Sequence, residues 1–222
     1  IKLDKDMLTI LEDPVIVVPS ASKAKGTSFE GHAFFEASSI RKVKNKYYFI
    51  YSSELSHELC YAVSDAPNHP FVYGGTVVDN GDLGISEKAK YFTGNNHGSI
   101  EEIQGNWYVF YHRHTNSSMY CRQGMIEPIE ISADGKIAQA EMTSCGPNNG
   151  PLPGEGEYPA YAACNLYMTK EPSVDIQSGI NPFPYITQDG PDRDAEDENQ
   201  EAAYIRNMVP GVVAGFKYFD CK

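Results

Sequence analysis

The chain has 222 residues, enough for one large β domain or for one domain and a piece of another. Its net charge of −12 argues against nucleic acid or an anionic membrane as a partner, because both bind basic surfaces. No stretch approaches the ~20 apolar residues of a membrane span. The chain starts at Ile1 without a methionine or a signal-like segment, so we expect that its natural start lies elsewhere and that its N-terminus gives no localisation.

Short runs of β-forming residues, separated by turn residues, predict an all-β fold. The first four strands are expected at residues 34–43, 46–53, 58–64 and 71–78. A second set is expected at residues 97–103, 106–112, 118–131 (with a break near Pro128) and 136–143. Two successive four-stranded units of similar length are typical of propeller blades. A β-sandwich of seven or eight strands has the same spacing and stays an alternative.

The last third of the chain changes character. Residues 145–159 are rich in glycine and proline, and residues 160–168 are expected to form one more strand. Residues 169–198 hold several prolines and then an acidic run, which is typical of a solvated linker. A calcium ion held by that run is a weaker alternative, because its spacing matches no EF-hand. Further strands are expected at residues 204–208 and 214–220.

The five cysteines lack the spacing of a metal site. Cys145 and Cys164 flank the loop rich in glycine and proline, so a disulfide between them is one alternative. We expect free buried thiols instead. An odd number of cysteines also fits a partner cysteine outside these residues.

One acid interrupts an aromatic strand, in the segment Phe34-Phe35-Glu36-Ala37-Ser38-Ser39. An isolated charge is costly to bury, so this carboxylate must be paired, neutralised or used. Burial raises the pKa of a carboxyl group, and such a group donates a proton to a leaving group near neutral pH. The alternative is that Glu36 reaches solvent at the strand end or pairs with Arg41.

Four motifs occur in order: Phe35-Glu36-Ala37-Ser38-Ser39, the strand 47–53, Asn96-His97-Gly98-Ser99-Ile100, and Trp107-Tyr108-Val109-Phe110-Tyr111-His112-Arg113. Over residues 1–168 the chain resembles glycoside hydrolase family 43, which contains β-xylosidases and α-L-arabinofuranosidases acting on plant cell-wall glycans. The tail, 185–222, resembles the opening strands of a carbohydrate-binding β-sandwich of the family 6 type.

The resemblance implies the later blades of a five-bladed propeller at residues 1–168, a linker at 169–184 and a truncated sandwich module at 185–222. It also implies an inverting mechanism, in which an acid protonates the leaving oxygen while a base activates water. Glu36 matches the general acid. The base and a third, tuning aspartate belong to earlier blades, so we expect both upstream of Ile1. The aspartates before Glu36 do not match those motifs.

The same resemblance assigns a substrate-binding role to three more residues. His97 is placed near the propeller axis, where it contacts a central calcium ion or water cluster as one ligand among waters. Arg122 is the candidate for the arginine that reaches the sugar, with Arg113 as its rival, since a guanidinium suits adjacent hydroxyls. A salt bridge to Glu127 is the structural alternative for both. Phe35, with Phe34, is expected to form an apolar pocket wall, although one of the two is expected in the core.

Two other functions stay open on the sequence. A catalytically silent carbohydrate-binding propeller would retain the fold but lack the two aspartates. A glycan phosphorylase would need a phosphate site rich in arginine and histidine, and no such cluster is evident. The family resemblance implies an extracellular or periplasmic location. It also implies that the earlier blades of the same protein are partners of this chain, and that without them it is poorly soluble and inactive.

Overall fold

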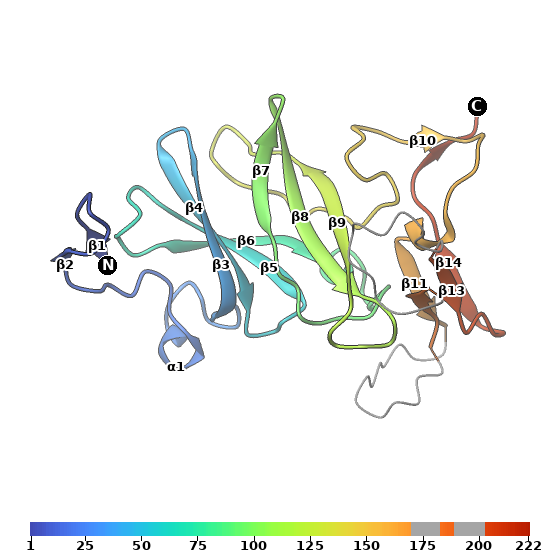
Figure 1. Ribbon diagram of the computed structural model, residues 1–222, viewed down its shortest axis with the longest axis horizontal. Helices are drawn as coiled ribbons and strands as arrows, with labels where there is room; N and C mark the ends of the chain where they lie inside the picture. The colour runs from blue at the N-terminus through green and yellow to red at the C-terminus, as the bar shows by residue number, and fades with distance from the viewer. Residues whose placement is uncertain (170–182, 189–202) are drawn as a thin grey trace.

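The computed structural model describes residues 1–169, 183–188 and 203–222 (Figure 1). Strands dominate these residues, and the two helical elements are single turns, α1 (Ala21–Ala24) and the 3₁₀ turn Ala160–Ala162. The all-β prediction is confirmed. None of the helices in the described part of the chain is long and apolar enough to cross a membrane. The linker and the acidic run fall almost wholly outside the described residues.

The first sheet consists of four consecutive antiparallel strands, β3 (Phe34–Val43), β4 (Lys46–Ser53), β5 (Glu58–Ser64) and β6 (Val72–Asp79), in the order β3-β4-β5-β6. The predicted bounds agree, apart from a shift of one residue in the last strand. Lys44 adopts a positive φ of 52° in the turn between β3 and β4, which suits the right-handed twist of a tight hairpin.

The second sheet has three antiparallel strands, β7 (Ser99–Ile103), β8 (Asn106–His114) and β9 (Arg122–Ile129). Gln104 and Gly105 both adopt positive φ in the turn between β7 and β8. Pro128 lies within β9 and not at a break. An edge strand tolerates proline because one side of its backbone needs no donor for a neighbouring strand.

The predicted fourth strand of this sheet, residues 136–143, is wrong. Three of its backbone N–H groups bond to the first sheet or to the turn after it, and the segment forms no backbone ladder with β9. Ile137 donates to the Tyr61 hydroxyl (3.0 Å), Ala140 to the Val77 carbonyl (2.7 Å) and Met142 to the Asp82 carboxylate (3.0 Å). These tertiary partners satisfy the backbone donors of residues 136–143. The segment therefore crosses the first sheet and does not extend the second.

A hydrophobic core joins the two sheets. Ile50, Leu59 and Val77 of the first sheet and Ile100 and Val109 of the second are all fully buried in one cluster. A smaller cluster, which includes Phe49, Tyr51 and Phe71, covers the other face of the first sheet. The two sheets lie side by side in Figure 1, and β3 contacts β7 across their boundary.

Several short strands complete the described residues. They are β1 (Lys2–Leu3), β2 (Ile10–Glu12), β10 (Leu152–Pro153), β11 (Asn165–Met168), β12 (Tyr185–Thr187), β13 (Tyr204–Arg206), β14 (Val212–Gly215) and β15 (Phe219–Asp220). The predicted strand 160–168 is half right, because residues 160–162 form the 3₁₀ turn.

The tail strands pair with segments earlier in the chain. β14 pairs with β11, β13 with β12, and β15 runs parallel to β10 (Figure 1). The strand expected at residues 214–220 is thus divided, since only its two ends belong to β14 and β15, and both of these strands are paired. The assignment of residues 185–222 to a separate module stays a prediction. All five cysteines are free thiols, and Cys145 and Cys164 are not bonded to each other.

Candidate active site

Glu36 lies where β3 is irregular. The register between β3 and β4 shifts twice, between Phe34 and Glu36 and between Glu36 and Ser39, and Ala37 has a positive φ of 56°. Such bulges redirect a side chain and are frequent beside active sites. The Glu36 side chain is 43% exposed, so the burial that the aromatic sequence suggested is wrong. Because of the bulges, the Glu36 side chain departs from the regular alternation of β3 and points toward the neighbouring sheet.

His97 meets Glu36 at this boundary. Its Nε2 lies 2.9 Å from Glu36 Oε1, within hydrogen-bond distance, although the two residues are 61 positions apart. The hydroxyls of Ser39 and Ser99 lie 2.6 Å apart and form a second link between β3 and the start of β7. Two of the four sequence motifs therefore come together here.

The segment that carries His97 is fixed from both sides. Asn96 is fully buried, and its side-chain amide donates to the carbonyls of His57 (3.0 Å) and Val78 (3.4 Å). Gly98 packs so closely on β8 that an added Cβ would stand 2.0 Å from the Phe110 carbonyl oxygen. Both sequence neighbours of His97 are therefore fixed, Asn96 by its hydrogen bonds and Gly98 by its close packing on β8.

His112 extends the pair into a row of three. Its ring lies 5.3 Å from the His97 ring, centroid to centroid, in an edge-to-face arrangement with an interplanar angle of 61°. Burial, reinforced by the positive charge of Arg122, lowers the pKa of His112 to about 4, so the ring is neutral at pH 7. The Nδ1 of His112 is buried and has no hydrogen-bond partner among the residues that the structure describes.

Arg122 opens β9 on the same side of the sheet. Its Nη1 lies 3.2 Å from Nδ1 of His114, two residues from His112 on the same face of β8. Burial and the charge of Arg122 lower the pKa of His114 to about 4. Arg122 remains largely exposed and therefore accessible to a ligand.

The rival arginine has a structural role. Arg113 is fully buried, stacks on Tyr91 with 4.3 Å between guanidinium carbon and ring centroid, and donates to the carbonyls of Cys164 and Tyr161. The alternation of β8 points it away from His112. A role for Arg113 in contacting substrate, kept open as the alternative, does not fit this position. The alternative pairing of Glu36 with Arg41 is also wrong, since Arg41 Nε donates to Glu101 at 2.9 Å.

Phe35 and Phe34 separate as expected. Phe34 packs on Phe49 and Tyr51, with ring centroids 6.0 Å apart in both cases. Phe35 is 57% exposed. Its exposed ring suits stacking on a sugar face.

The calcium ion expected near His97 stays a prediction. Calcium takes ~6–8 oxygen ligands, and the expected site has His97 as one ligand among waters. In this structure the Nε2 of His97 contacts Glu36. Within residues 1–169, 183–188 and 203–222, the one group of three potential side-chain ligands is His32, Glu58 and Cys60.

That group is satisfied without an ion. Glu58 Oε1 lies 2.7 Å from His32 Nδ1 and accepts from Ser53 Oγ, and its Oε2 accepts from Thr76 Oγ1 at 3.1 Å. Burial raises the pKa of the Cys60 thiol, which keeps it protonated. The cluster is a hydrogen-bond network beneath β5, and we assign it no metal.

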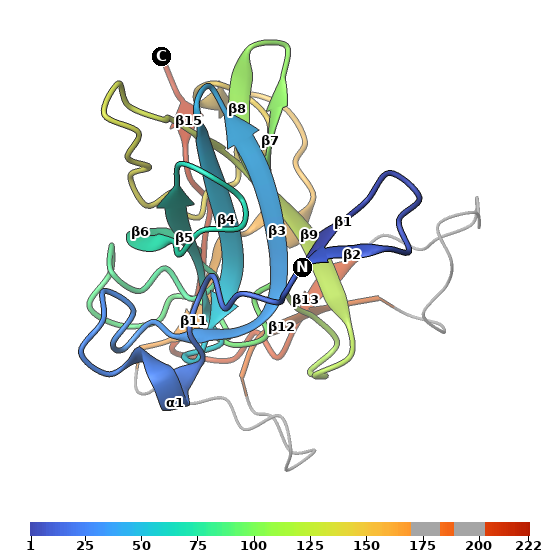
Figure 2. The ribbon, with the colours of Figure 1, turned by 90° about the vertical axis from the view of Figure 1, so that its left-hand side faces the viewer.

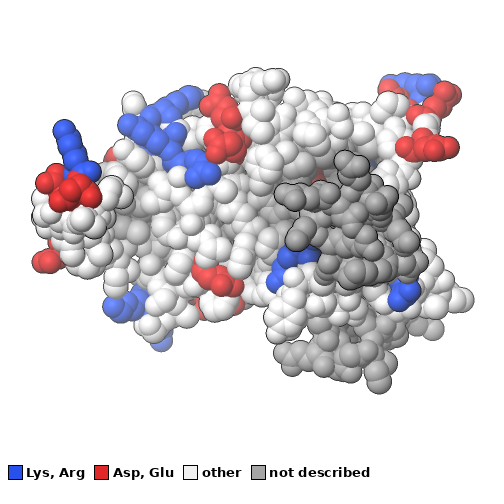
Figure 3. All heavy atoms as spheres, in the orientation of Figure 1, with Lys and Arg blue, Asp and Glu red and all other residues white. Residues whose placement is uncertain are grey.

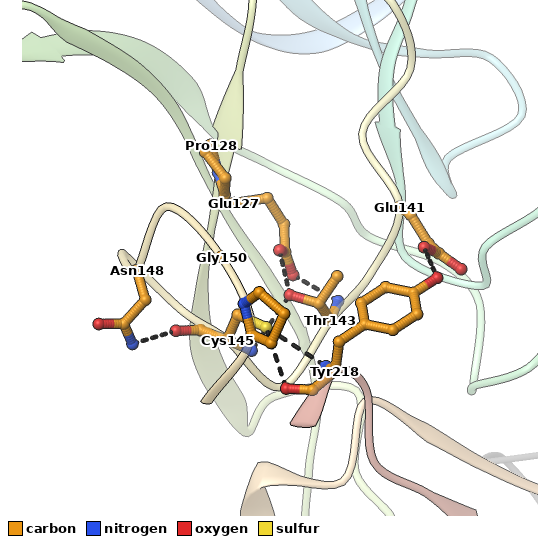
Figure 4. A pocket seen from close by; sticks show the side chains of 9 residues that line it. Glu127, Pro128, Glu141, Thr143, Cys145, Asn148, Gly150 and Tyr218 are labelled. Carbon is orange, nitrogen blue, oxygen red and sulfur yellow. Dashed lines mark hydrogen bonds between the residues drawn. The ribbon is translucent and has the colours of Figure 1, made fainter. Parts of the chain in front are cut away.

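A second buried acid, Glu127, lies beside a cavity of about 230 Å³ (Figure 4). The backbone N–H and the hydroxyl of Thr143 donate to its two oxygens at 2.7 and 2.6 Å, and the Tyr111 hydroxyl lies 3.4 Å away. Burial raises the pKa of Glu127 to about 7. Glu127 thus holds the crossing segment onto β9 and makes no salt bridge with either arginine.

The surface around these elements carries charges of both signs. On the face shown in Figure 3, basic and acidic side chains stand close to one another and leave wide uncharged areas. Arg41 and Glu101 form an ion pair at 2.9 Å.

Comparison with known proteins decides the family. The model of the glycosyl hydrolases family 43 matches residues 1–137. The chain belongs to glycosyl hydrolase family 43. It is 56% identical to a protein named xylosidase/arabinosidase from Thermoclostridium stercorarium, in an alignment covering 99% of this chain and 47% of that relative.

Two further matches share less of their sequence with this chain. A β-xylosidase from Xylanibacter ruminicola is 35% identical over 61% of this chain and 40% of its own length. Among solved structures, a family 43 enzyme from Xanthomonas citri complexed with xylotriose is 28% identical, with a TM-score of 0.48 over 62% of this chain and 40% of that one. This family 43 chain spans about half the length, or less, of the curated relatives that it matches.

Sequence reasoning found Glu36 and His97 but gave no role to His112 or Asn96. Both stand inside the quoted motifs. Strand alternation places His112 and His114 on one face of β8 and Arg113 on the other, so the period of the strand alone would have separated them. The anchoring by Asn96 depends on two carbonyls from β6 and from the turn before β5, and no sequence signal predicts that contact.

Proposed function

We propose that this chain is part of a glycoside hydrolase that cleaves xylose- or arabinose-containing plant cell-wall glycans, with Glu36 as the proton donor. The contact between Glu36 and His97 carries the proposal, because it brings two of the family motifs, each with an ionisable side chain, to one accessible place. The names of the relatives, xylosidase and arabinosidase, give the substrate class.

The mechanism proposed is inverting. An inverting glycosidase separates its acid and base by ~6.5–9.5 Å, so that a water molecule fits between them. Asp6, one of the aspartates before Glu36, accepts hydrogen bonds from Thr9 and Leu8 within the exposed β1–β2 turn, which is a local structural role. We infer that the base comes from a part of the protein outside these 222 residues, since the chain spans 47% of its relative.

Four further proposals follow the family. The strands of residues 1–168 form later blades of a five-bladed propeller, Arg122 and Phe35 contact the sugar, residues 185–222 begin a carbohydrate-binding module, and the protein acts outside the cytoplasm. The exposed guanidinium of Arg122 and the exposed ring of Phe35 support the second of these. A catalytically silent carbohydrate-binding propeller stays the competing function.

The test is Glu36→Gln in the full-length protein that carries this chain. Loss of a proton donor costs ~10²–10⁴-fold in rate when the leaving group needs protonation. We expect that loss on natural xylo- or arabino-oligosaccharides, and a much smaller loss on aryl glycosides with acidic phenol leaving groups. Equal losses on both substrates would contradict the acid role.

A wild-type protein that binds these glycans without cleaving them would favour the silent propeller. NMR of the first-formed sugar anomer tests the inverting mechanism separately. Inversion gives a product with the opposite anomeric configuration to the substrate.

A further inference from the structure

We infer that His112 is a positioning residue for the proton donor, in that its ring holds His97 in the orientation that contacts Glu36. The inference rests on the proposed function of Glu36 and adds a residue to which the family resemblance gave no role.

The geometry that carries the inference is a row of three side chains from three strands or their ends. Glu36 Oε1 lies 2.9 Å from His97 Nε2, and the His97 ring lies 5.3 Å from the His112 ring in an edge-to-face arrangement. His97 is 38% exposed, so solvent alone would leave its ring free to rotate about χ2. The His112 ring is the described aromatic contact that restricts it.

The position of His112 is itself fixed by the sheet. It lies in the middle of the regular pairing between β8 and β9, opposite Gly124, whose missing side chain leaves room above the strand. The backbone carbonyl of His112 also accepts from the amide of Asn80 at 3.4 Å. A ring attached at this point of a sheet is a firmer support than one on a loop.

The buried Nδ1 of His112 lowers the stability of the folded chain. An unpartnered buried polar atom loses its hydrogen bonds to water, and a phenylalanine at this place would avoid that loss.

Orientation of His97 matters for proton donation because a carboxyl group has two oxygens. When the N–H of His97 Nε2 donates to Oε1, the acidic proton of Glu36 is left on Oε2, free for the leaving oxygen. If the His97 ring turns away, the proton of Glu36 can lie on either carboxyl oxygen. The rate should then fall only with leaving groups that need a proton.

The experiment compares two variants of His112 and one control variant of the full-length protein on two substrates. His112→Ala removes the ring and should lower kcat ~10–100-fold on an alkyl or oligosaccharide substrate, but only a few-fold on an aryl glycoside with a good leaving group. His112→Phe keeps a ring in place and should retain kcat within a few-fold on both. Phe110→Ala, a ring truncation on the same face of β8, is the matched control and should affect both substrates equally.

Each outcome supports or contradicts the positioning role of His112. Equal losses on both substrates in His112→Ala would reduce His112 to a structural residue. A His112→Phe variant as selective and as damaged as His112→Ala would show that a ring nitrogen acts, and would overturn the positioning role. If Glu36→Gln lacks the leaving-group selectivity in the same assay, the proposed function fails. If Glu36→Gln shows it and His112→Ala does not, this inference alone fails.

A readout without turnover complements the kinetics. A hydrogen-bonded imidazole N–H gives a downfield proton NMR signal that Glu36→Gln should shift. We expect that signal to disappear in His112→Ala and to persist in His112→Phe. Its persistence in His112→Ala would contradict the inference whatever the activity.

Discussion

Two glutamates on neighbouring parts of the same fold differ in an instructive way. Glu127 is almost fully buried, is hydrogen-bonded by Thr143, and has a pKa raised to about 7. Glu36 is 43% exposed, stands at a bulge and contacts His97. A search for a perturbed carboxyl group alone would select Glu127. Its hydrogen bonds are nevertheless all used in holding one segment to another, whereas Glu36 faces a surface that a ligand can reach.

The comparison shows that a shifted pKa and access to a ligand are separate properties of a carboxyl group. Burial perturbs any carboxyl group, including one that only joins elements of the core. A proton donor must in addition reach a substrate. The following variants test whether the Glu36 region acts as a site and the Glu127 region as a structural joint.

The largest effect is expected from Gly98→Ala. The new Cβ would stand 2.0 Å from the Phe110 carbonyl oxygen, which is backbone and cannot move away easily. The free energy of unfolding should fall by about 3 kcal/mol or more, and activity by ~10²-fold or more because His97 is displaced. Denaturant unfolding and kcat measure the two effects. Gly124→Ala, where the Cβ meets open space, is the control for stability; a neutral Gly98→Ala would remove the packing argument for the site.

Lys217→Met tests the joint between the tail and the body. Lys217 Nζ lies 3.3 Å from Asp82 Oδ2 and 2.7 Å from Glu141 Oε1, and Asp82 is buried. Removal of the cation should lower the free energy of unfolding by about 2–3 kcal/mol, less than for a fully buried pair because Lys217 is partly exposed. Thermal unfolding checks this value.

The control for that variant is Lys136→Met, which removes an exposed partner of Asp134 and should leave stability unchanged. Equal effects of the two lysine variants would show that the tail is not held by Lys217.

Glu127→Gln should change the pH dependence of stability. Between pH ~4.5 and ~7 the folded chain keeps a proton on Glu127 and the unfolded chain does not, so the free energy of unfolding falls as pH rises through this window. Glutamine removes that contribution. From pH 4.5 to 7 the variant should gain on the order of 1–3 kcal/mol relative to wild type, as measured by urea unfolding at several pH values.

Glu141→Gln should show the opposite trend. Burial alone would raise the pKa of Glu141, but the hydrogen bonds from Lys217 and Tyr218 lower it. The contribution of Glu141 to the free energy of unfolding is therefore present above the pKa that this group has in the unfolded chain. It is lost as the pH falls through the lower pKa of the folded chain. Parallel pH profiles for wild type and both variants would contradict these assignments.

The smallest effect is expected from Arg41→Ala. Its ion pair with Glu101 is exposed on both sides, and such pairs contribute ~0–1 kcal/mol. Activity should stay within about two-fold of wild type, since Glu36 pairs with His97 and not with Arg41. A large loss of activity would show that Arg41 supports the site after all, and kcat on a natural substrate measures it.

The sequence by itself determined the all-β class, the first sheet with three of its four strands to the residue, and the nomination of Glu36 and His97. Strand alternation and turn residues are local properties, so a chain reveals them without its partners. The sequence also nominated Arg122, with Arg113 as its rival, and alternation along β8 separates Arg113 from His112.

Only the tertiary structure decided the rest. Residues 136–143 have the composition of a strand, but their backbone donors find Tyr61, Val77 and Asp82, so no ladder with β9 forms. The bulges at Glu36 turned a residue expected in the core toward solvent. The row from Glu36 through His97 to His112 joins positions up to 76 residues apart, and contacts of that range exist only when the sheets pack.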